Sequence, residues 1–214
     1  MQLQRDVIDE LKWRPETRNA EIGVAAKDGV VTLTGMVPTY GMRLAATRAA
    51  EQVVGVRAVA DELKVRLADG AVRTDTDIAH AATAALRWNA DVPDTLITVK
   101  VEDGWVTLHG DVAWQFEKTA AERSIQHLIG VKGVINRINV MPPMVSGAEV
   151  QRQIADALKR SATVDANRIS VDATGNKVTL RGTVRSWTER SDAESAAWAA
   201  PGVTAVEDLI AVGL

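Results

Sequence analysis

The amino-acid sequence predicts an α+β protein made of three tandem α-β-β-α-β two-layer sandwiches, each a three-stranded mixed sheet with two helices on one face. A short phrase recurs as DGVVTLTG, DGWVTLHG and GNKVTLRG, which end at Gly35, Gly110 and Gly182. A second phrase recurs with the same two offsets, as GVRAV from Gly55, GVKGV from Gly130 and GVTAV from Gly202. Apolar residues between these phrases have helical spacing in some segments and alternate in others, so the copies extend well beyond the two phrases.

The recurring phrases divide the chain into three expected domains, residues 1–67, 74–141 and 146–214. A unit of this size buries only about 60% of the surface of its unfolded chain and is marginally stable alone. We therefore expect the three copies to pack on each other, which their short linkers allow.

Each unit begins with a segment whose apolar residues recur every four positions, as in Leu3, Val7 and Leu11. This spacing predicts an amphipathic helix with one apolar stripe. In the second and third copies, TDTD from Thr74 and SGAE from Ser146 match the capping-box pattern, which predicts where these helices begin.

Two short alternating segments follow, Ile22/Val24 and Val31/Leu33 in the first copy, and predict a β-hairpin. The Asp-Gly pairs at 28–29 and 103–104 suit the positive φ angles of a tight turn. The sequence ATGN in the third copy predicts a slightly longer turn. The glycines that close the first phrase are expected at a bulge or strand exit with a φ angle that other residues avoid.

A second helix is predicted from a face of small residues, Ala46, Ala49 and Ala50 in the first copy. Gly55 and its two equivalents stand where a left-handed C-terminal cap is expected. A third alternating segment, such as Val134/Ile138/Val140, completes the sheet. The six recurring glycines are thus interpreted as residues that shape the backbone and not as ligand-binding residues.

The arrangement of amphipathic helix, VTLTGMV, VTLHGDV or VTLRGTV hairpin, alanine-rich helix and GV motif resembles the BON domain family, known from OsmY-like osmotically induced proteins of bacteria. The resemblance covers nearly the whole chain as three tandem copies. It implies a non-enzymatic, stress-associated protein that contacts phospholipid or envelope components. One relative in the cytoplasm is linked to potassium binding, which implies a ligand sensor as an alternative.

Composition sets further limits. The chain has 25 Lys and Arg against 28 Asp and Glu, so no overall positive charge attracts nucleic acid, and none is expected as a partner. Without cysteine, disulfides and thiolate chemistry are excluded. No apolar run reaches the roughly 18 residues needed for a transmembrane segment, so a membrane could be met only peripherally. The charged N-terminus does not resemble a signal peptide, which indicates a cytoplasmic protein as written, or a periplasmic one if a leader was removed.

No catalytic or metal-binding pattern is found. His80, His109 and His127 fall at different positions of the repeat and share no HxxxH spacing, so we expect neither a metal nor another cofactor. Ser124 and Ser161 lack the context of a nucleophile elbow. We therefore expect that the protein is not an enzyme.

The six tryptophans are the candidate contact residues. Glu51 and Gln126 occupy the position of Trp198 in the other copies, and a core position would not accept glutamate, so Trp198 is expected to point away from the alanine face. Trp105 is expected on the outward side of the second strand. Trp13 and Trp88 are predicted at the flank of the first helix, and Trp114 and Trp187 in the loop that enters the second.

Two interpretations of these tryptophans remain open. They could fill the seams between the modules and cover the free sheet faces, or they could stay exposed and enter a membrane interface. Basic residues beside Trp114 and Trp187 would support binding to an anionic surface; they are Lys118, Arg123, Arg185 and Arg190. Binding to phospholipid head groups is the first hypothesis, and a cytoplasmic protein-interaction scaffold or a sensor of a small ligand or potassium is the second.

Overall fold

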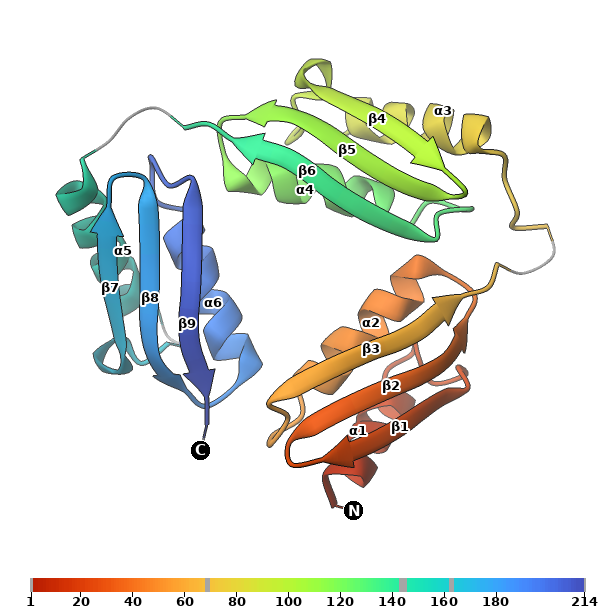
Figure 1. Cartoon of the computed structure of the whole chain (residues 1–214), viewed down its shortest axis with the longest axis horizontal. Helices are drawn as coiled ribbons and strands as arrows, with labels where there is room; N and C mark the ends of the chain where they lie inside the picture. Colours follow the sequence, from red (N-terminus) through yellow and green to blue (C-terminus); the bar gives the residue numbers. More distant parts are fainter. Residues whose placement is uncertain (1, 68–69, 143–145, 162–163, 214) are drawn as a thin grey trace.

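The computed structural model of the protein describes residues 2–67, 70–142, 146–161 and 164–213, which form three copies of one α-β-β-α-β unit (Figure 1). Repeat 1 consists of α1 (Gln2–Trp13), β1 (Ile22–Lys27), β2 (Val30–Val37), α2 (Tyr40–Glu51) and β3 (Ala58–Val65). Repeat 2 consists of α3 (Asp75–Trp88), β4 (Ile97–Glu102), β5 (Trp105–Val112), α4 (Gln115–Ile125) and β6 (Gly133–Val140). Repeat 3 consists of α5 (Gly147–Arg160), β7 (Ile169–Thr174), β8 (Lys177–Val184), α6 (Trp187–Trp198) and β9 (Ala205–Val212). A 3₁₀ turn precedes the first strand of repeats 2 and 3, at Asp94–Leu96 and Ala166–Arg168.

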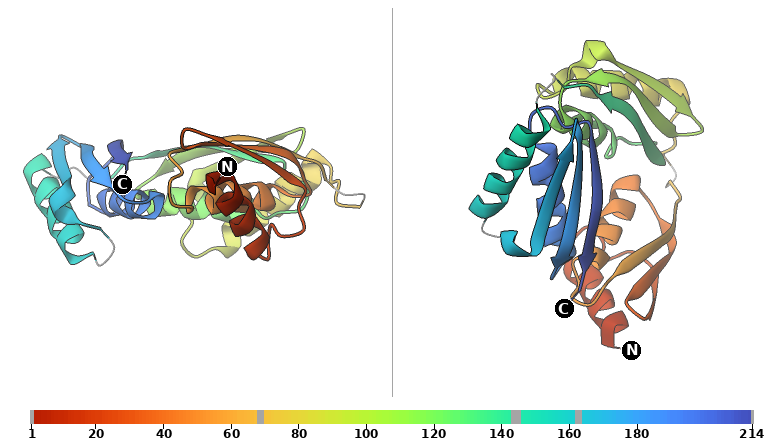
Figure 2. Two further views of the ribbon diagram at one scale, coloured as in Figure 1. Left: turned by 90° about the horizontal axis from the view of Figure 1, so that it is seen from below. Right: turned by 60° about the vertical axis from the view of Figure 1, so that its left-hand side comes forward.

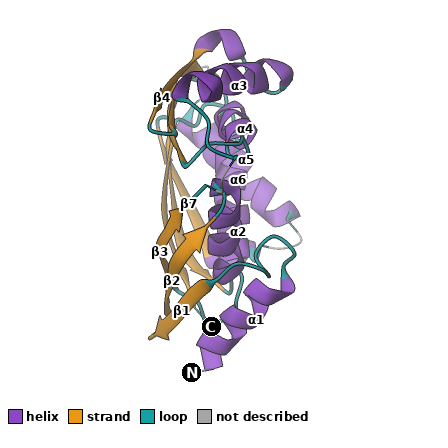
Figure 3. Ribbon diagram, turned by 90° about the vertical axis from the view of Figure 1, so that its right-hand side faces the viewer, coloured by secondary structure: helices purple, strands orange, loops and turns teal. Residues whose placement is uncertain are grey.

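Each repeat has a three-stranded mixed sheet, as predicted. The strand orders are β1-β2-β3, β4-β5-β6 and β7-β8-β9, with the first pair antiparallel and the second pair parallel. The helices lie on one side of the sheets and leave the other side open (Figure 3). This arrangement confirms the two-layer sandwich.

Each repeat also has its own hydrophobic core between the helices and the sheet. In repeat 1 the stripe residues Val7 and Leu11 of α1 pack with Leu33 of β2 and Ala46 of α2. Equivalent clusters form around Ile78 and Leu108 in repeat 2, and around Ile154 and Leu180 in repeat 3. In α2 the stripe residues Ala46, Ala49 and Ala50 are fully buried, which lets this helix approach the sheet closely.

The hairpin turns differ between the copies. Asp28 and Gly29 both have positive φ angles, +52° and +81°, as in a type I′ turn. In repeat 3 the turn is not longer than in the others, because Thr174 pairs directly with Lys177 across two residues. There Gly175 has φ +59° and Asn176 does not have a positive φ, which is the type II′ pattern. The prediction of a longer third turn was wrong because glycine at the first turn position allows an equally short connection.

The two sets of recurring glycines have positive φ angles for different reasons. Gly110 has φ +148°, and a Cβ atom on it would lie 2.1 Å from the carbonyl oxygen of Leu96, at the start of the neighbouring strand. Gly55 has φ +91° but is not the C-terminal cap of α2, because the cap residue is Gln52 in a right-handed conformation. Instead Gly55 is the third residue of a turn that a Val56 N–H to Val53 O bond of 3.2 Å closes. This extra turn is needed to lead the chain from α2 into β3.

The predicted capping boxes are formed in one case of two. Thr74 and Asp77 make both reciprocal bonds at the start of α3. At the start of α5, Ser146 accepts the Glu149 N–H, but the Glu149 carboxylate binds Arg152 and Gln153 instead of returning to the cap.

The three repeats are arranged in a ring, with their second helices in sequence around it (Figure 1). The start of α2 lies at the end of α4, the start of α4 at the end of α6, and the start of α6 near the end of α2. We call these contacts the 1–2 joint, the 2–3 joint and the 3–1 joint. Seen edge-on, the ring is flat (Figure 2).

Candidate binding site at the joints between repeats

The 1–2 joint is closed by the first residues of α2. Tyr40 packs against the hydrophobic core of repeat 2, and its hydroxyl lies beside the backbone of Val134. Burial raises the pKa of the Tyr40 phenol, and the nearby Glu122 carboxylate raises it further. The next residue, Gly41, lies directly on His127, because a Cβ atom there would be 2.6 Å from His127 Nδ1. The joint therefore combines an aromatic side chain with close backbone contact.

The 3–1 joint uses the same position of the repeat. Trp187 is the first residue of α6, as Tyr40 is of α2, and its Nε1 donates a 2.9 Å hydrogen bond to the carbonyl oxygen of Val56. The guanidinium of Arg190 lies 5.0 Å from the centre of the Trp187 ring and is held by Asp208 through a 2.6 Å ion pair. The sequence placed Trp187 in the loop before the helix, whereas the structure places it in the first turn of the helix.

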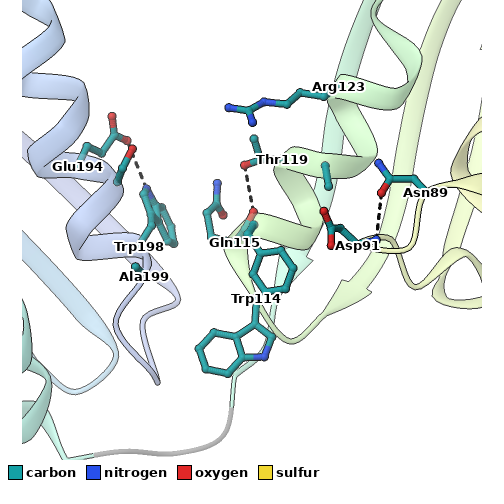
Figure 4. A pocket seen from close by; sticks show the side chains of 12 residues that line it. Asn89, Asp91, Trp114, Gln115, Thr119, Arg123, Glu194, Trp198 and Ala199 are labelled. Carbon is teal, nitrogen blue, oxygen red and sulfur yellow. Dashed lines mark hydrogen bonds between the residues drawn. The ribbon is translucent and has the colours of Figure 1, made fainter.

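The 2–3 joint differs because Gln115 is the first residue of α4. At this position no aromatic side chain reaches the neighbouring repeat, and a cavity of about 760 Å³ lies between α4 and α6 (Figure 4). At the equivalent place in the 1–2 joint the cavity is about 410 Å³. Residues on both helices and on the segment after α3 line the larger cavity, among them Asp91, Trp114, Phe116, Arg123, Glu194 and Trp198.

The two cavities are built from equivalent positions of the repeats. Three small or polar residues of the 1–2 joint are replaced by aromatic residues in the 2–3 joint: Thr39 by Trp114, Gly41 by Phe116 and Gln126 by Trp198. The 2–3 joint is therefore larger and also far more aromatic.

Trp198 is not turned away from the protein interior, which corrects the prediction from its position. It is half-buried and packs against the core of repeat 3, and its Nε1 donates to Glu194 Oε1 over 3.3 Å. Its equivalent in repeat 2, Gln126, is only 7% exposed. A polar residue is accepted here because the position lies at the contact with a neighbouring repeat, as Gln126 does beside the start of α2 in repeat 1.

One positive and two negative side chains border the larger cavity. Arg123 is exposed, and no ion pair of Arg123 occurs within the described part of the chain. Glu194 is engaged by the indole of Trp198, and Asp91 lies in the segment that follows α3. Arg123 extends from α4 toward α6, while Trp114 lies at the opposite end of the lining (Figure 4).

Buried or half-buried carboxylates anchor the starts of α4 and α6. Trp114 is the N-cap residue of α4 and its indole cannot accept a hydrogen bond, so Glu117 Oε2 accepts the N–H groups of Ala113 and Trp114, both at 2.9 Å. In α6, Glu189 accepts the N–H groups of Arg185 and Asp165 at 2.8 Å and 3.1 Å. Burial raises the pKa of Glu189, but these N–H groups and the Arg185 charge outweigh it and lower the pKa below the ordinary value.

The remaining tryptophans named from the sequence lie away from the joints. Trp13 and Trp88 are 82% and 84% exposed at the ends of α1 and α3. Trp105 lies on the outer face of its sheet, with its ring against Gly133. The outer sheet faces are therefore not covered by tryptophans from other repeats.

The basic residues named with the tryptophans have different environments. Arg185 and Arg190 are paired with Glu189 and Asp208. Lys118 has no ion pair within the described residues. It occupies the position of Arg190, but the residue in the place of Asp208 is Asn136, whose side chain donates a hydrogen bond to the Lys118 carbonyl oxygen.

Sequence reasoning did not select Tyr40, Gln115 or Phe116 as site residues. The available signal was that Tyr40, Gln115 and Trp187, three different residue types, occupy the same position in the three copies. Such variation indicates that the side chain contacts a neighbouring repeat and not its own core.

The described part of the chain contains neither a cluster of metal ligands nor a membrane-spanning helix. Among the described residues, no group of three or more His, Asp or Glu side chains could hold a metal ion. No helix in that part of the chain combines the length and the apolar character needed to cross a bilayer.

The chain belongs to the BON domain family, whose profile matches residues 2–66, 74–142 and 146–213. It is a protein of three tandem BON domains. Over 123 residues it is 34% identical to the osmotically-inducible protein Y of Escherichia coli (strain K12), and the match covers 56% of this chain and 61% of that protein. The matched part is thus less than two thirds of the relative's length.

Two solved structures of CdsD, a structural protein of the type III secretion system of Chlamydia trachomatis, align with 100% of this chain. One is 16% identical with a TM-score of 0.27 and is covered to 93%. The other, a C-terminal domain, is 14% identical with a TM-score of 0.28 and is covered to 98%. These scores are too low to support an argument about this protein.

Proposed function

We propose that this chain is a non-enzymatic, osmotic-stress-associated binding protein whose BON modules contact phospholipid head groups. Its three BON domains and its similarity to an osmotically inducible protein support the association with osmotic stress. The observation that carries the lipid contact is the exposed face of α3.

The exposed face of α3 has an unusual composition. Trp88 is 84% exposed at its end, and Ala81, Ala84 and Arg87 are exposed beside it. The two acidic residues of the helix, Asp75 and Asp77, both lie in its first turn. After Asp77 the helix contains no acidic side chain.

Both acidic residues of α3 are also engaged locally. Asp75 accepts the N–H groups of Asp103 and Gly104, at 2.8 Å and 2.9 Å. Asp77 binds Thr74 in the capping box, which lowers the pKa of its carboxyl. An anionic lipid surface would therefore meet alanine, arginine and tryptophan along most of this face.

These residue types suit a peripheral membrane contact. An indole buries its rings among lipid head groups and keeps its N–H hydrated. A basic residue near an anionic surface contributes about 1 kcal/mol. One tryptophan and one arginine give a weak and salt-sensitive contact.

The equivalent helix of repeat 1 provides an internal control. Trp13 has the position of Trp88 and nearly the same exposure, and Lys12 stands where Arg87 stands in α3. The difference is Asp9, which precedes Trp13 by four residues on the same side of α1, whereas Glu10 is ion-paired with Arg14 over 2.7 Å. The Asp9 carboxylate repels an anionic surface. In repeat 3 the position is occupied by Arg160.

Liposome flotation of the full chain at low salt tests the proposal, with vesicles of phosphatidylglycerol and phosphatidylethanolamine and with phosphatidylcholine alone. We expect flotation with anionic vesicles only, a loss of most of it in Trp88→Ala and Arg87→Gln, and little change in Trp13→Ala. No flotation of the wild type, or equal effects of Trp88→Ala and Trp13→Ala, would contradict this assignment.

The second hypothesis, a small-ligand sensor or scaffold, is favoured by one observation, the aromatic cavity at the 2–3 joint.

A further inference from the structure

We propose that the cavity at the 2–3 joint binds a small organic anion with an aromatic body. This inference concerns a different surface from the lipid-contacting face of α3 and does not depend on it.

The three joints differ in the residue that meets the neighbouring repeat. In the 1–2 and 3–1 joints the first residue of the second helix, Tyr40 or Trp187, supplies a ring that reaches the neighbouring repeat. In the 2–3 joint this residue is Gln115, and the space remains open at about 760 Å³. A ring supplied by a ligand would complete the third joint in the way that protein side chains complete the other two.

The lining of the cavity is rich in aromatic side chains. Trp114, Phe116 and Trp198 border the cavity, and each replaces a small or polar residue of the 1–2 joint. Aromatic residues at a ligand site favour planar apolar groups through stacking and edge-to-face contacts. The volume lies within the range of small-molecule sites, about 300–1,000 Å³.

The lining of the cavity contains one cation and two carboxylates. Arg123 borders the cavity without an ion pair among the described residues, and its guanidinium suits a carboxylate, sulfonate or phosphate. Glu194, which accepts the Trp198 indole N–H, and Asp91 both keep their negative charge and repel an anion. The anionic group of the ligand is therefore placed at Arg123, the one position of the lining that attracts it.

The orientation of the ligand in the cavity follows from the positions of Trp114 and Arg123 along α4. Trp114 and Arg123 are nine residues apart on α4, which corresponds to roughly 13 Å along the helix axis. Figure 4 shows these two side chains at opposite ends of the lining. An aromatic anion of two or three rings spans this distance, with its body toward Trp114 and its charge toward Arg123.

The probe for the test is 8-anilino-1-naphthalenesulfonate, an aromatic sulfonate whose fluorescence rises in apolar surroundings. The full chain is titrated without lipid below the temperature of unfolding, with excitation of the tryptophans to detect energy transfer. We expect saturable binding of one molecule per chain. Because no lipid is present, the result is independent of the flotation experiment.

Matched variants assign the site. Arg123→Gln removes the charged partner and should weaken binding roughly tenfold, whereas Arg48→Gln, the equivalent change at the 1–2 joint, should leave binding unchanged. Trp198→Gln introduces the residue of the equivalent position in repeat 2 and should remove most of the binding. Gln115→Trp should also block the site, because it introduces the residue that closes the 3–1 joint.

An uncharged probe, N-phenyl-1-naphthylamine, separates charge recognition from apolar contact. Arg123→Gln should leave its binding unchanged, while Trp198→Gln should weaken it. Melting temperatures of all variants should stay within a few degrees of the wild type, which shows that the site and not the fold has changed.

Several results would overturn the proposal. They are non-saturable binding of the sulfonate, equal effects of Arg123→Gln and Arg48→Gln, and unchanged binding in Trp198→Gln. A dimer in sedimentation velocity that Trp198→Gln dissociates would also overturn it, because a second copy of the chain would then occupy the cavity.

Discussion

The 1–2 joint and the 2–3 joint are two versions of one contact, built from equivalent residues with opposite results. In the 1–2 joint, Gly41 lies against His127 and the ring of Tyr40 reaches the core of repeat 2. In the 2–3 joint, Phe116 and Gln115 occupy these positions, three aromatic residues border the contact, and the cavity is nearly twice as large. Aromatic residues thus close a joint only where they stand at the first helical position and reach across it.

The 3–1 joint sharpens this comparison, because Trp187 holds it without any covalent connection between the two repeats that meet there. Repeats 1 and 2, and repeats 2 and 3, are consecutive in the chain. Closure of the ring therefore depends on contacts at the first turn of α6.

The largest effect is expected from Trp187→Ala. The substitution removes the indole that bonds to Val56 and should cost about 2 kcal/mol, less than for a fully buried tryptophan. We expect a lower melting temperature and a larger radius of gyration in small-angle X-ray scattering as the ring opens. Trp13→Ala, at an exposed tryptophan, is the control and should change neither. An unchanged radius of gyration would show that Trp187 does not close the ring.

An intermediate effect is expected from Glu189→Gln, which weakens the anchor of the same helix start. Loss of the charged acceptor of two backbone N–H groups should cost about 1–2 kcal/mol near neutral pH. Because the pKa of Glu189 is lowered, its stabilisation is complete above the ordinary glutamate pKa and is lost as the pH falls through the lowered value.

The difference in melting temperature between the wild type and Glu189→Gln should therefore be largest at neutral pH and shrink below about pH 4. Thermal unfolding followed by circular dichroism from pH 3 to pH 8 measures it. A difference that is constant across this range would show that the ionised carboxylate is not the stabilising form.

The smallest effect is expected from Tyr40→Phe, which keeps the ring of the 1–2 joint and removes its hydroxyl. We expect a loss of about 0.5–1 kcal/mol at pH 8. Since the pKa of Tyr40 is raised, the stabilisation is present below the ordinary tyrosine pKa and is lost as the pH rises through the raised value. The advantage of the wild type should thus disappear above about pH 10.

Tyr40 is the single tyrosine of the chain, so its ionisation can be followed directly by ultraviolet difference absorbance. Glu122→Gln should lower the pKa of Tyr40, because the Glu122 carboxylate raises it. A Tyr40 that titrates at the ordinary value in the folded protein would mean that the 1–2 joint is open in solution.

The fold could be predicted from the sequence because each unit carries its own signals. Stripe residues such as Val7 and Leu11 contact their own sheet, and Asp28–Gly29 form the expected turn directly between β1 and β2. These contacts are local to one repeat, so their periodicity is visible in every copy. Gly55 was misassigned because a positive φ angle serves a helix cap and a following turn equally well.

The joints could not be predicted in the same way. Glu51 and Gln126 at the position of Trp198 indicated an exposed site, yet Gln126 is buried by the neighbouring repeat. Which copy covers which position depends on the arrangement of the ring, and no pattern within one unit encodes it. Only the change from Tyr40 to Gln115 to Trp187 indicated that the three contacts differ.

The contact between Trp105 and Gly133 limits how the modules can be exchanged. These residues are register partners, and a Cβ atom on Gly133 would lie 2.3 Å from the indole of Trp105. Repeats 1 and 3 carry alanine at this partner position, Ala58 and Ala205, opposite Val30 and Lys177. A chimera that moves the hairpin of repeat 2 into either neighbour would force the partly exposed indole to turn aside, so the fit of this ring on the sheet is kept only when the second and third strands travel together.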